Sequence, residues 1–233
     1  MKLEILRELN AERAARRPVI VVTDTANGDQ RLVKAKDIAT DPLSAELAKQ
    51  LRMGKSGTIE SGGKKLFLNV YAPTARLVIV GAVHISQALA PLARSLDYDV
   101  TVVDPRTAFA SPERFPDVPL IAEWPDVALP PLNIDHYTAF VAVTHDPKID
   151  DPALLHAFER DCFYIGALGS RKTHAKRGER LRAQGAKDSD ILRIHAPIGL
   201  PIGAVSPSEI AVAIMAEITA QLRLPKEAKE AAA

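Results

Sequence analysis

Several features are scarce in this sequence of 233 residues, and each scarcity excludes a class of protein. The one cysteine, Cys162, rules out an internal disulfide and any multi-cysteine zinc or iron–sulfur site. No run reaches the roughly 18 consecutive apolar residues that a membrane-spanning helix needs. Residues 1–17 are charged throughout and lack the apolar segment of a secretory signal. We therefore expect a cytoplasmic protein with no membrane span.

The net charge of +1 leaves little room for a nucleic-acid partner, because such proteins usually have a basic balance over the whole domain. One segment departs from this balance. Residues 171–182 contain six cations and one anion, a local net charge of +5. So short a basic stretch suits a phosphate or an acidic protein face. The alternative is an ordinary solvated helix surface.

The first 75 residues predict a small α+β domain. Helical periodicity, hairpin patterns and a helix that begins at Asp41 as N-cap and ends at Gly54 all occur within it. The predicted elements are a helix over 2–16, strands over 18–24 and 31–36, a helix over 41–54, and strands over 57–60 and 65–71.

Residues 76–224 follow a different pattern, in which short continuous apolar runs alternate with helical periodicity. The runs are 77–81, 99–104, 119–124, 139–145 and 162–169. Such runs are typical of strands buried on both faces of a parallel sheet, so this part predicts a Rossmann-like, doubly wound α/β domain. Ser206 and Glu209 form a capping box that starts a last helix. Residues 225–233 predict a disordered tail.

Ligands of doubly wound sheets bind at the carboxyl ends of the strands, and chemically distinctive residues occur at these ends. Gly81 opens a strand-to-helix turn that can present backbone N–H groups to a phosphate, and His84 is either a ligand contact or a polar helix cap. Asp104 lies where a Rossmann acid binds ribose hydroxyls. Arg106 can pair with Asp104 or reach a phosphate, the plainest alternative being a surface ion pair.

The fourth strand ends in Thr144, His145 and Asp146, a hydroxyl, an imidazole and a carboxylate that can form a hydrogen-bonding or acid/base set. Because adjacent residues of an extended chain point in opposite directions, at most two of the three share one site. The alternative for His145 is a role in the loop or in capping. Residues 148–151 have the pattern of an ordinary helix start.

The fifth strand ends in the sequence's clearest phosphate signal. Gly166 and Gly169 flank the strand end, Ser170 can cap the next helix, and Arg171 and Lys172 stand in its first turn. Cations are electrostatically unfavourable in a first turn, so their presence suggests that an anion binds there.

Two segments after this helix complete the candidate site. His195 and Gly199 belong to an irregular run with two prolines and two glycines, and His195 can face the pocket. Glu217 is a weaker candidate for a site or a dimer contact. Cys162 is expected to point into the core as a small hydrophobe rather than to carry sulfur.

Taken in order, five of these motifs resemble the XdhC/CoxI family, the accessory proteins of molybdenum hydroxylases such as xanthine dehydrogenase and CO dehydrogenase. The resemblance spans roughly residues 76–222. The motifs are residues 81–85, 103–106, 144–146, 164–171, and 195–199 continuing through Gly203 to Ala211.

The resemblance implies a chaperone rather than an enzyme. It would bind molybdenum cofactor (molybdopterin or its dinucleotide form) as cargo, protect it while a cysteine desulfurase supplies the sulfido ligand, and deliver it to an apo molybdenum hydroxylase. It also implies a homodimer. The family's cysteine-bearing N-terminal motifs are absent from residues 1–75, so any sulfur or metal handling by them would need a separate polypeptide.

Two other classes of function stay open. An NAD(P)-dependent oxidoreductase is favoured by Asp104 but opposed by the glycine fingerprint, because Val83 stands where the second glycine should be. A nucleotide-sensing or scaffold protein without catalysis is the third possibility. Binding of pterin, of NAD(P)H or of neither distinguishes them.

Overall fold

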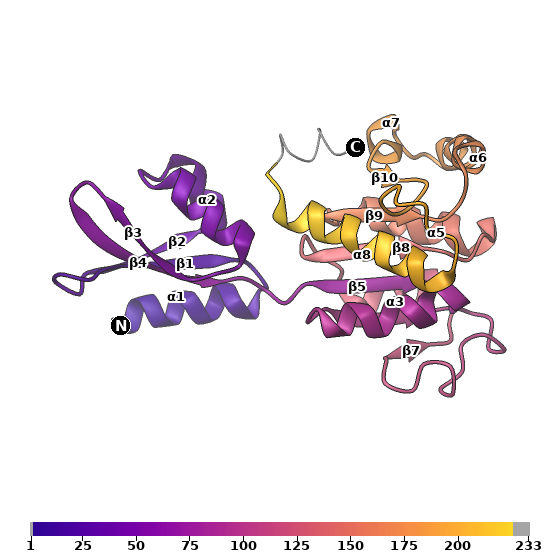
Figure 1. Cartoon of the computed structure of the whole chain (residues 1–233), viewed down its shortest axis with the longest axis horizontal. Helices are drawn as coiled ribbons and strands as arrows, with labels where there is room; N and C mark the ends of the chain where they lie inside the picture. The colour runs from indigo at the N-terminus through magenta and orange to yellow at the C-terminus, as the bar shows by residue number, and fades with distance from the viewer. Residues whose placement is uncertain (1, 226–233) are drawn as a thin grey trace. The chain divides into compact units, whose positions relative to one another are not determined.

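The computed structural model describes residues 2–225, which form two compact units (Figure 1). The first unit comprises the residues up to Pro73 together with those from Arg223 onward, and the second comprises Thr74–Leu222. Most of the tail expected over 225–233 lies outside the described residues. None of the helices described between residues 2 and 225 is long and apolar enough to cross a membrane.

The first unit is a four-stranded antiparallel sheet in the order β2-β1-β4-β3, with one helix on each face. Alternation along β1 explains the two layers, because Val19 and Val21 pack with Leu9 of α1 whereas Ile20 packs with Leu47 of α2. The elements are α1 (Leu3–Ala14), β1 (Val19–Asp24), β2 (Gln30–Lys34), η1 (Ala35–Thr40), α2 (Ser44–Met53), β3 (Gly57–Ser61) and β4 (Lys64–Tyr71).

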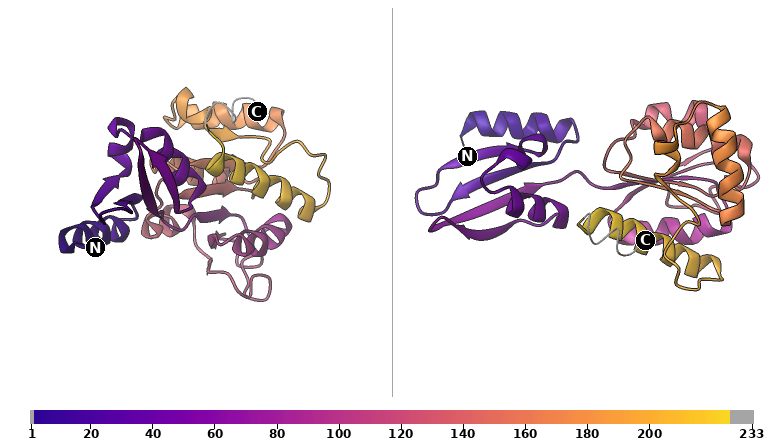
Figure 2. Two further views of the ribbon diagram at one scale, coloured as in Figure 1. Left: turned by 60° about the vertical axis from the view of Figure 1, so that its left-hand side comes forward. Right: turned by 90° about the horizontal axis from the view of Figure 1, so that it is seen from above.

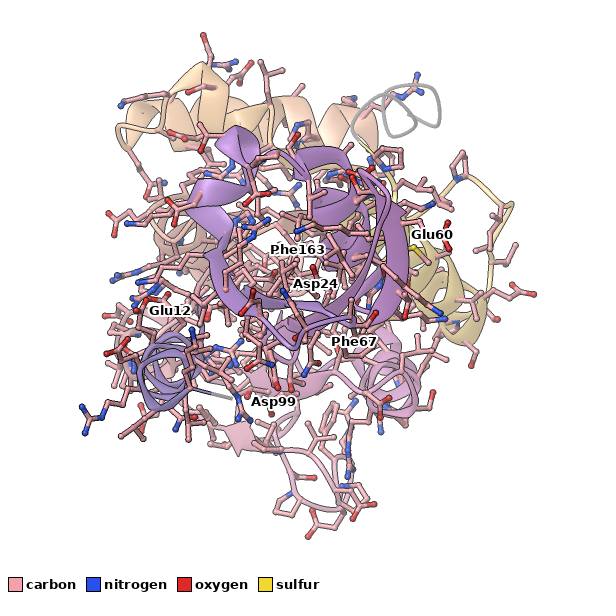
Figure 3. All side chains as sticks on the ribbon, turned by 90° about the vertical axis from the view of Figure 1, so that its left-hand side faces the viewer. Glu12, Asp24, Glu60, Phe67, Asp99 and Phe163 are labelled. Atoms are coloured by element: carbon pink, nitrogen blue, oxygen red, sulfur yellow. The ribbon has the colours of Figure 1, made fainter. Side chains whose placement is uncertain are left out.

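Polar side chains fix both helices of this unit. Glu12 of α1, labelled in Figure 3, accepts a 2.6 Å hydrogen bond from Arg17. The prediction that Asp41 caps α2 is wrong, because its carboxylate accepts from the backbone N–H of Leu43 at 2.9 Å and pairs with Arg31. Residues 41–43 therefore form a turn, and α2 begins three residues later than expected.

The second unit is a six-stranded parallel sheet in the order β10-β9-β8-β5-β6-β7. This is the strand order of a Rossmann fold, with its switch point between β5 and β8, and it confirms the predicted fold class. The strands are β5 (Arg76–Val80), β6 (Asp99–Val103), β7 (Leu120–Ile121), β8 (Thr138–Ala142), β9 (Tyr164–Ala167) and β10 (Ile194–His195).

Helices cover both faces of this sheet, which explains its continuous apolar runs (Figure 2). Leu77 and Ile79 face α3 (His84–Ser95) and α8 (Pro207–Arg223), whereas Val78 and Val80 face the helices of the opposite layer. That layer contains α4 (Pro125–Ala128), α5 (Pro147–Phe158), α6 (Arg171–Ala183) and α7 (Asp188–Ile191), and η2 (Pro130–Leu132) follows α4.

The structure departs from the predicted strands at two places. The run 119–124 pairs only through Leu120 and Ile121, and β10 is a sixth strand in a segment for which the sequence predicts an irregular path. A two-residue strand has no periodicity of its own, so only its pairing with Ile165 and Gly166 of β9 defines it. The capping box of α8 is confirmed, because Glu209 accepts from the N–H of Ser206 at 2.8 Å.

Candidate functional site

The carboxyl ends of β5, β6, β8 and β9 lie side by side at one edge of the parallel sheet. Backbone hydrogen bonds join their last residues, from the N–H of Gly81 to Val103 O at 2.8 Å and from the N–H of Val143 to Val80 O at 2.9 Å. The loops that follow these strands therefore surround the switch-point crevice, where ligands of this fold bind.

Asp104 follows β6 and is fully buried, so the expectation of a surface ion pair is wrong. Its carboxylate accepts from Ala82 N at 2.7 Å and from Arg106 N, Nε and Nη2 at 2.8–2.9 Å. Burial acts to raise the pKa of Asp104, but the hydrogen bonds from Arg106 and Ala82 outweigh it and hold this pKa below its ordinary value. Both oxygens are thus engaged within the protein, which leaves Arg106 as the group at the edge.

The loop after Asp104 contains two residues that sequence reasoning missed. Arg114 donates to Ala82 O at 2.9 Å and to Phe109 O at 2.8 Å, so it fastens this loop to the turn after β5. The guanidinium of Arg106 lies 4.5 Å from the centre of the Phe109 ring, and that side chain remains 41% exposed. No spacing in the sequence indicates these contacts, because the loop lacks periodicity.

The turn between β5 and α3 is compact. Gly81 has a φ of +121°, and a Cβ there would stand 2.9 Å from Thr144 Cγ2, so the position accommodates glycine only. Val83 is the N-cap residue of α3 and makes no side-chain cap. His84 is therefore not the cap; it is the first residue of α3 and is exposed.

The structure separates the three polar residues after β8. Thr144 is buried and donates through Oγ1 to Asp150 at 2.7 Å, while Asp146 caps α5 by accepting from Lys148 N at 2.9 Å. His145 is exposed at the edge, with a φ of +64° that is rare for a side chain other than glycine. Of the three, His145 alone presents its side chain to solvent.

Asp150 and Arg177 lie beneath His145 and were both missed as site residues. The Asp150 carboxylate also accepts from the N–H of His145 at 3.1 Å, and Arg177, 2% exposed, donates through Nη2 to Leu168 O at 2.6 Å. Burial raises the pKa of Asp150 and lowers that of Arg177, against their mutual attraction. Within residues 2–225, Nε and Nη1 of Arg177 have no hydrogen-bond partner.

The loop from β9 to α6 has the form that the sequence predicts. Gly169 has a φ of +129°, and Ser170 caps α6 by accepting from Thr173 N at 3.2 Å. Arg171 and Lys172 are exposed in the first turn, and neither pairs with any group of the described chain. Gly166, by contrast, lies inside β9, where a Cβ would collide with Ile198 at 2.5 Å. This glycine is explained by packing.

The basic stretch 171–182 is less free than its charge suggests. Arg177 is buried, Arg180 pairs with Asp151 at 2.6 Å, and Arg182 pairs with Asp188 at 2.6 Å. The cations left without an acidic partner within residues 2–225 are Arg171, Lys172 and Lys176. The anion-binding potential of α6 is thus concentrated toward its N-terminus.

A second polar cluster, which we call the Glu217 cluster, contains Tyr164, His195, Gly199 and Glu217. Glu217 of α8 accepts from Tyr164 Oη at 2.5 Å, from Gly199 N at 2.8 Å, and contacts His195 Nδ1 at 3.0 Å. The rings of Tyr164 and His195 stack with centres 4.7 Å apart. No hydrogen bond among residues 2–225 links this cluster to His145.

Cys162 is buried, as expected. Burial raises the pKa of its thiol to about 12, and its sulfur lies 3.8 Å from Ala157 O. The thiol therefore stays protonated at neutral pH, which disfavours a role in sulfur transfer because the thiolate is the nucleophile.

The Glu217 cluster predicts acid sensitivity of the second unit. Burial acts to raise the pKa of Glu217, but hydrogen bonds from His195 and Tyr164 hold it below its ordinary value. A carboxyl with a lowered folded-state pKa stabilises the protein above its unfolded pKa and loses this contribution as pH falls through the folded value. The stability advantage of the wild type over Glu217→Gln should therefore shrink from about pH 5 to pH 3. Urea unfolding monitored by the single tryptophan, Trp124, measures it; an unchanging difference would contradict the prediction.

Comparison with known proteins places the chain in a family. The model of the XdhC Rossmann domain matches residues 77–218. The chain belongs to the XdhC family. This confirms the resemblance seen in the sequence, and the matched range covers the six-stranded sheet and most of α8.

Three curated relatives match about two thirds of the XdhC chain. The uncharacterized protein YqeB of Escherichia coli is 33% identical over 67% of this chain and 29% of its own length. A probable xanthine dehydrogenase subunit of Bacillus subtilis is 34% identical over 66% and 44%, and the molybdenum cofactor insertion chaperone PaoD of E. coli is 32% identical over 67% and 43%. The matched segments thus span less than half of the length of these relatives.

A solved structure shares the fold. It is described as a xanthine dehydrogenase from Bacillus halodurans and superposes with a TM-score of 0.69 at 24% identity, covering 97% of this chain and 68% of that one. At this identity the likeness concerns the fold alone.

Proposed function

We propose that this XdhC protein binds molybdenum cofactor, protects it during sulfuration and delivers it to a molybdenum hydroxylase of the xanthine or CO dehydrogenase type. Family membership and the name of the relative PaoD support this direction. The observation that carries it is the pair Arg171 and Lys172, two exposed cations without acidic partners in the described chain, at a helix N-terminus beside the switch-point crevice. That placement is unfavourable without a bound anion.

Each part of the crevice has a role in this proposal. The phosphate of the cofactor would bind Arg171 and Lys172 together with the first backbone N–H groups of α6. Arg106, held by Asp104, would bind a second oxyanion or a polar edge of the ligand. His145 would contact the ligand core, because its side chain alone of the 144–146 motif is exposed.

The same geometry is unfavourable for NAD(P). The acid that would bind ribose hydroxyls is Asp104, and both of its oxygens already accept hydrogen bonds from Ala82 and Arg106. Val83 gives the β5–α3 turn a side chain where the dinucleotide fingerprint has a glycine that lets pyrophosphate approach. The cofactor chaperone is therefore the better proposal.

The partners in this proposal are an apo molybdenum hydroxylase that receives the cofactor and a cysteine desulfurase that sulfurates it. A separate polypeptide would supply the cysteine-bearing motifs that residues 1–75 lack. The active form would be a cytoplasmic homodimer.

Equilibrium binding of isolated molybdenum cofactor, with NAD(H) as a parallel ligand, tests the proposal. We expect about one cofactor per protomer and no binding of NAD(H). The Arg171→Ala/Lys172→Ala variant should bind about tenfold more weakly or worse, since charged hydrogen bonds contribute about 1.5–3 kcal/mol each, and its affinity should depend less on salt.

The matched control is Lys55→Ala/Lys176→Ala, which removes the same charge at two exposed positions outside that first turn. Equal weakening in both variants would reduce the effect to net charge. Binding of NAD(H) alone would overturn the proposal in favour of an oxidoreductase.

A further inference from the structure

The Glu217 cluster contains an acceptor that serves three donors. Oε2 of Glu217 accepts from Tyr164 Oη and Gly199 N, and Oε1 faces Nδ1 of His195. The side chain of Glu217 is 14% exposed, while that of His195 is 28% exposed. The carboxylate is therefore enclosed, and the imidazole reaches solvent.

The protonation states in this cluster follow from the donor count. The pKa of Glu217 lies below its ordinary value and burial puts that of Tyr164 well above, so at neutral pH Glu217 is ionised and Tyr164 keeps its proton. A carboxylate can only accept, so Nδ1 of His195 must carry a hydrogen. Whenever the ring is neutral, its lone pair therefore lies on Nε2.

The position of Nε2 makes this lone pair available. His195 is the last residue of β10, an edge strand, and pairs in register with Gly166 of β9. Among residues 2–225, no group forms a hydrogen bond with Nε2, and that atom is not buried. The ring itself is held by its stacking on Tyr164, which is 1% exposed.

We infer that Glu217 is a positioning residue that holds His195 as a fixed hydrogen-bond acceptor, with Nε2 directed to an N–H or amino group of a heterocyclic ligand. The ligand half of this inference rests on the proposed function, since reduced pterins carry such donors. Glu217 acts through the histidine and does not itself touch the ligand.

Glu217→Gln is the sharpest variant because it keeps size and shape. The N–H of Gly199 can only donate, so the amide oxygen of the glutamine must face Gly199 and its NH₂ must face His195. Nδ1 then accepts, and the proton moves to Nε2. The substitution thus converts the outward nitrogen from acceptor to donor.

Two-bond ¹H–¹⁵N correlation spectra at pH 7.5 measure the tautomers of the six histidines without any ligand. We expect the signal that disappears in His195→Gln to show an Nδ1–H tautomer in the wild type and an Nε2–H tautomer in Glu217→Gln. Glu179→Gln, the same change at an exposed site of α6, should leave that signal unaltered. An Nε2–H tautomer in the wild type, or no change in Glu217→Gln, would overturn the role of Glu217.

Binding of isolated molybdenum cofactor decides the ligand half. We expect affinity to fall about tenfold in both Glu217→Gln and His195→Gln, with His136→Gln, an exposed histidine before β8, as control. Wild-type affinity in a variant with the switched tautomer would exclude His195 from the cofactor site while leaving the chaperone proposal intact. A wild type that binds no cofactor would instead overturn the proposed function and the ligand half together, and the spectra would still decide the Glu217 half.

Discussion

Replacing Asp150 by alanine is expected to lower the free energy of unfolding of the second unit by about 3–5 kcal/mol. The substitution leaves the guanidinium of Arg177, 2% exposed, without the nearby charge that offsets its burial. It also removes the acceptor for Thr144 Oγ1 and for the N–H of His145. His145 would then lose the bond that supports its φ of +64°.

Urea unfolding followed by Trp124 fluorescence measures this effect within the second unit. Asp188→Ala is the control, because it breaks the exposed ion pair with Arg182 and should cost at most about 1 kcal/mol. The double variant Asp150→Leu/Arg177→Met removes both buried charges and should recover most of the loss. If the double variant is no more stable than Asp150→Ala, charge compensation is not the cause.

The second large effect is expected for Gly81→Ala. A Cβ at this position would lie 2.9 Å from Thr144 Cγ2 and 3.1 Å from Thr144 N, and the φ of +121° is unfavourable for any L side chain. Because β5 and β8 are central paired strands, the collision can be relieved only by moving the switch point. We expect a loss of at least about 3 kcal/mol, from backbone strain and overpacking together.

Gly185→Ala separates the two causes of that loss. Gly185 has a φ of +94°, but a Cβ there would meet nothing within 4 Å, so this variant carries the backbone strain alone. It should cost about 1–2 kcal/mol in the same fluorescence-monitored unfolding. Equal losses for both glycines would show that the approach of Thr144 to Gly81 is not tight in solution.

The strand-end motifs of the sequence locate the crevice correctly but assign several of its residues to the wrong side of the surface. Asp104 and Asp146 look alike in the sequence, each a carboxylate directly after an apolar run. In the structure Asp104 is buried and binds Arg106, while Asp146 caps α5. Acids at strand ends are therefore candidates for internal hydrogen bonding as much as for ligand binding.

The fold class, the positions of the main strands, the capping box of α8 and the phosphate-like start of α6 are all predictable from the sequence, because they depend on local periodicity and local hydrogen bonds. Which polar residues meet depends instead on tertiary packing. Glu217 lies 53 residues from Tyr164 and 22 from His195 along the chain, and Arg177 lies 9 residues after Leu168. Such contacts form only when helices from different segments pack on the sheet, and no local pattern encodes them. That packing made Asp150, Arg177 and Glu217 parts of the candidate sites.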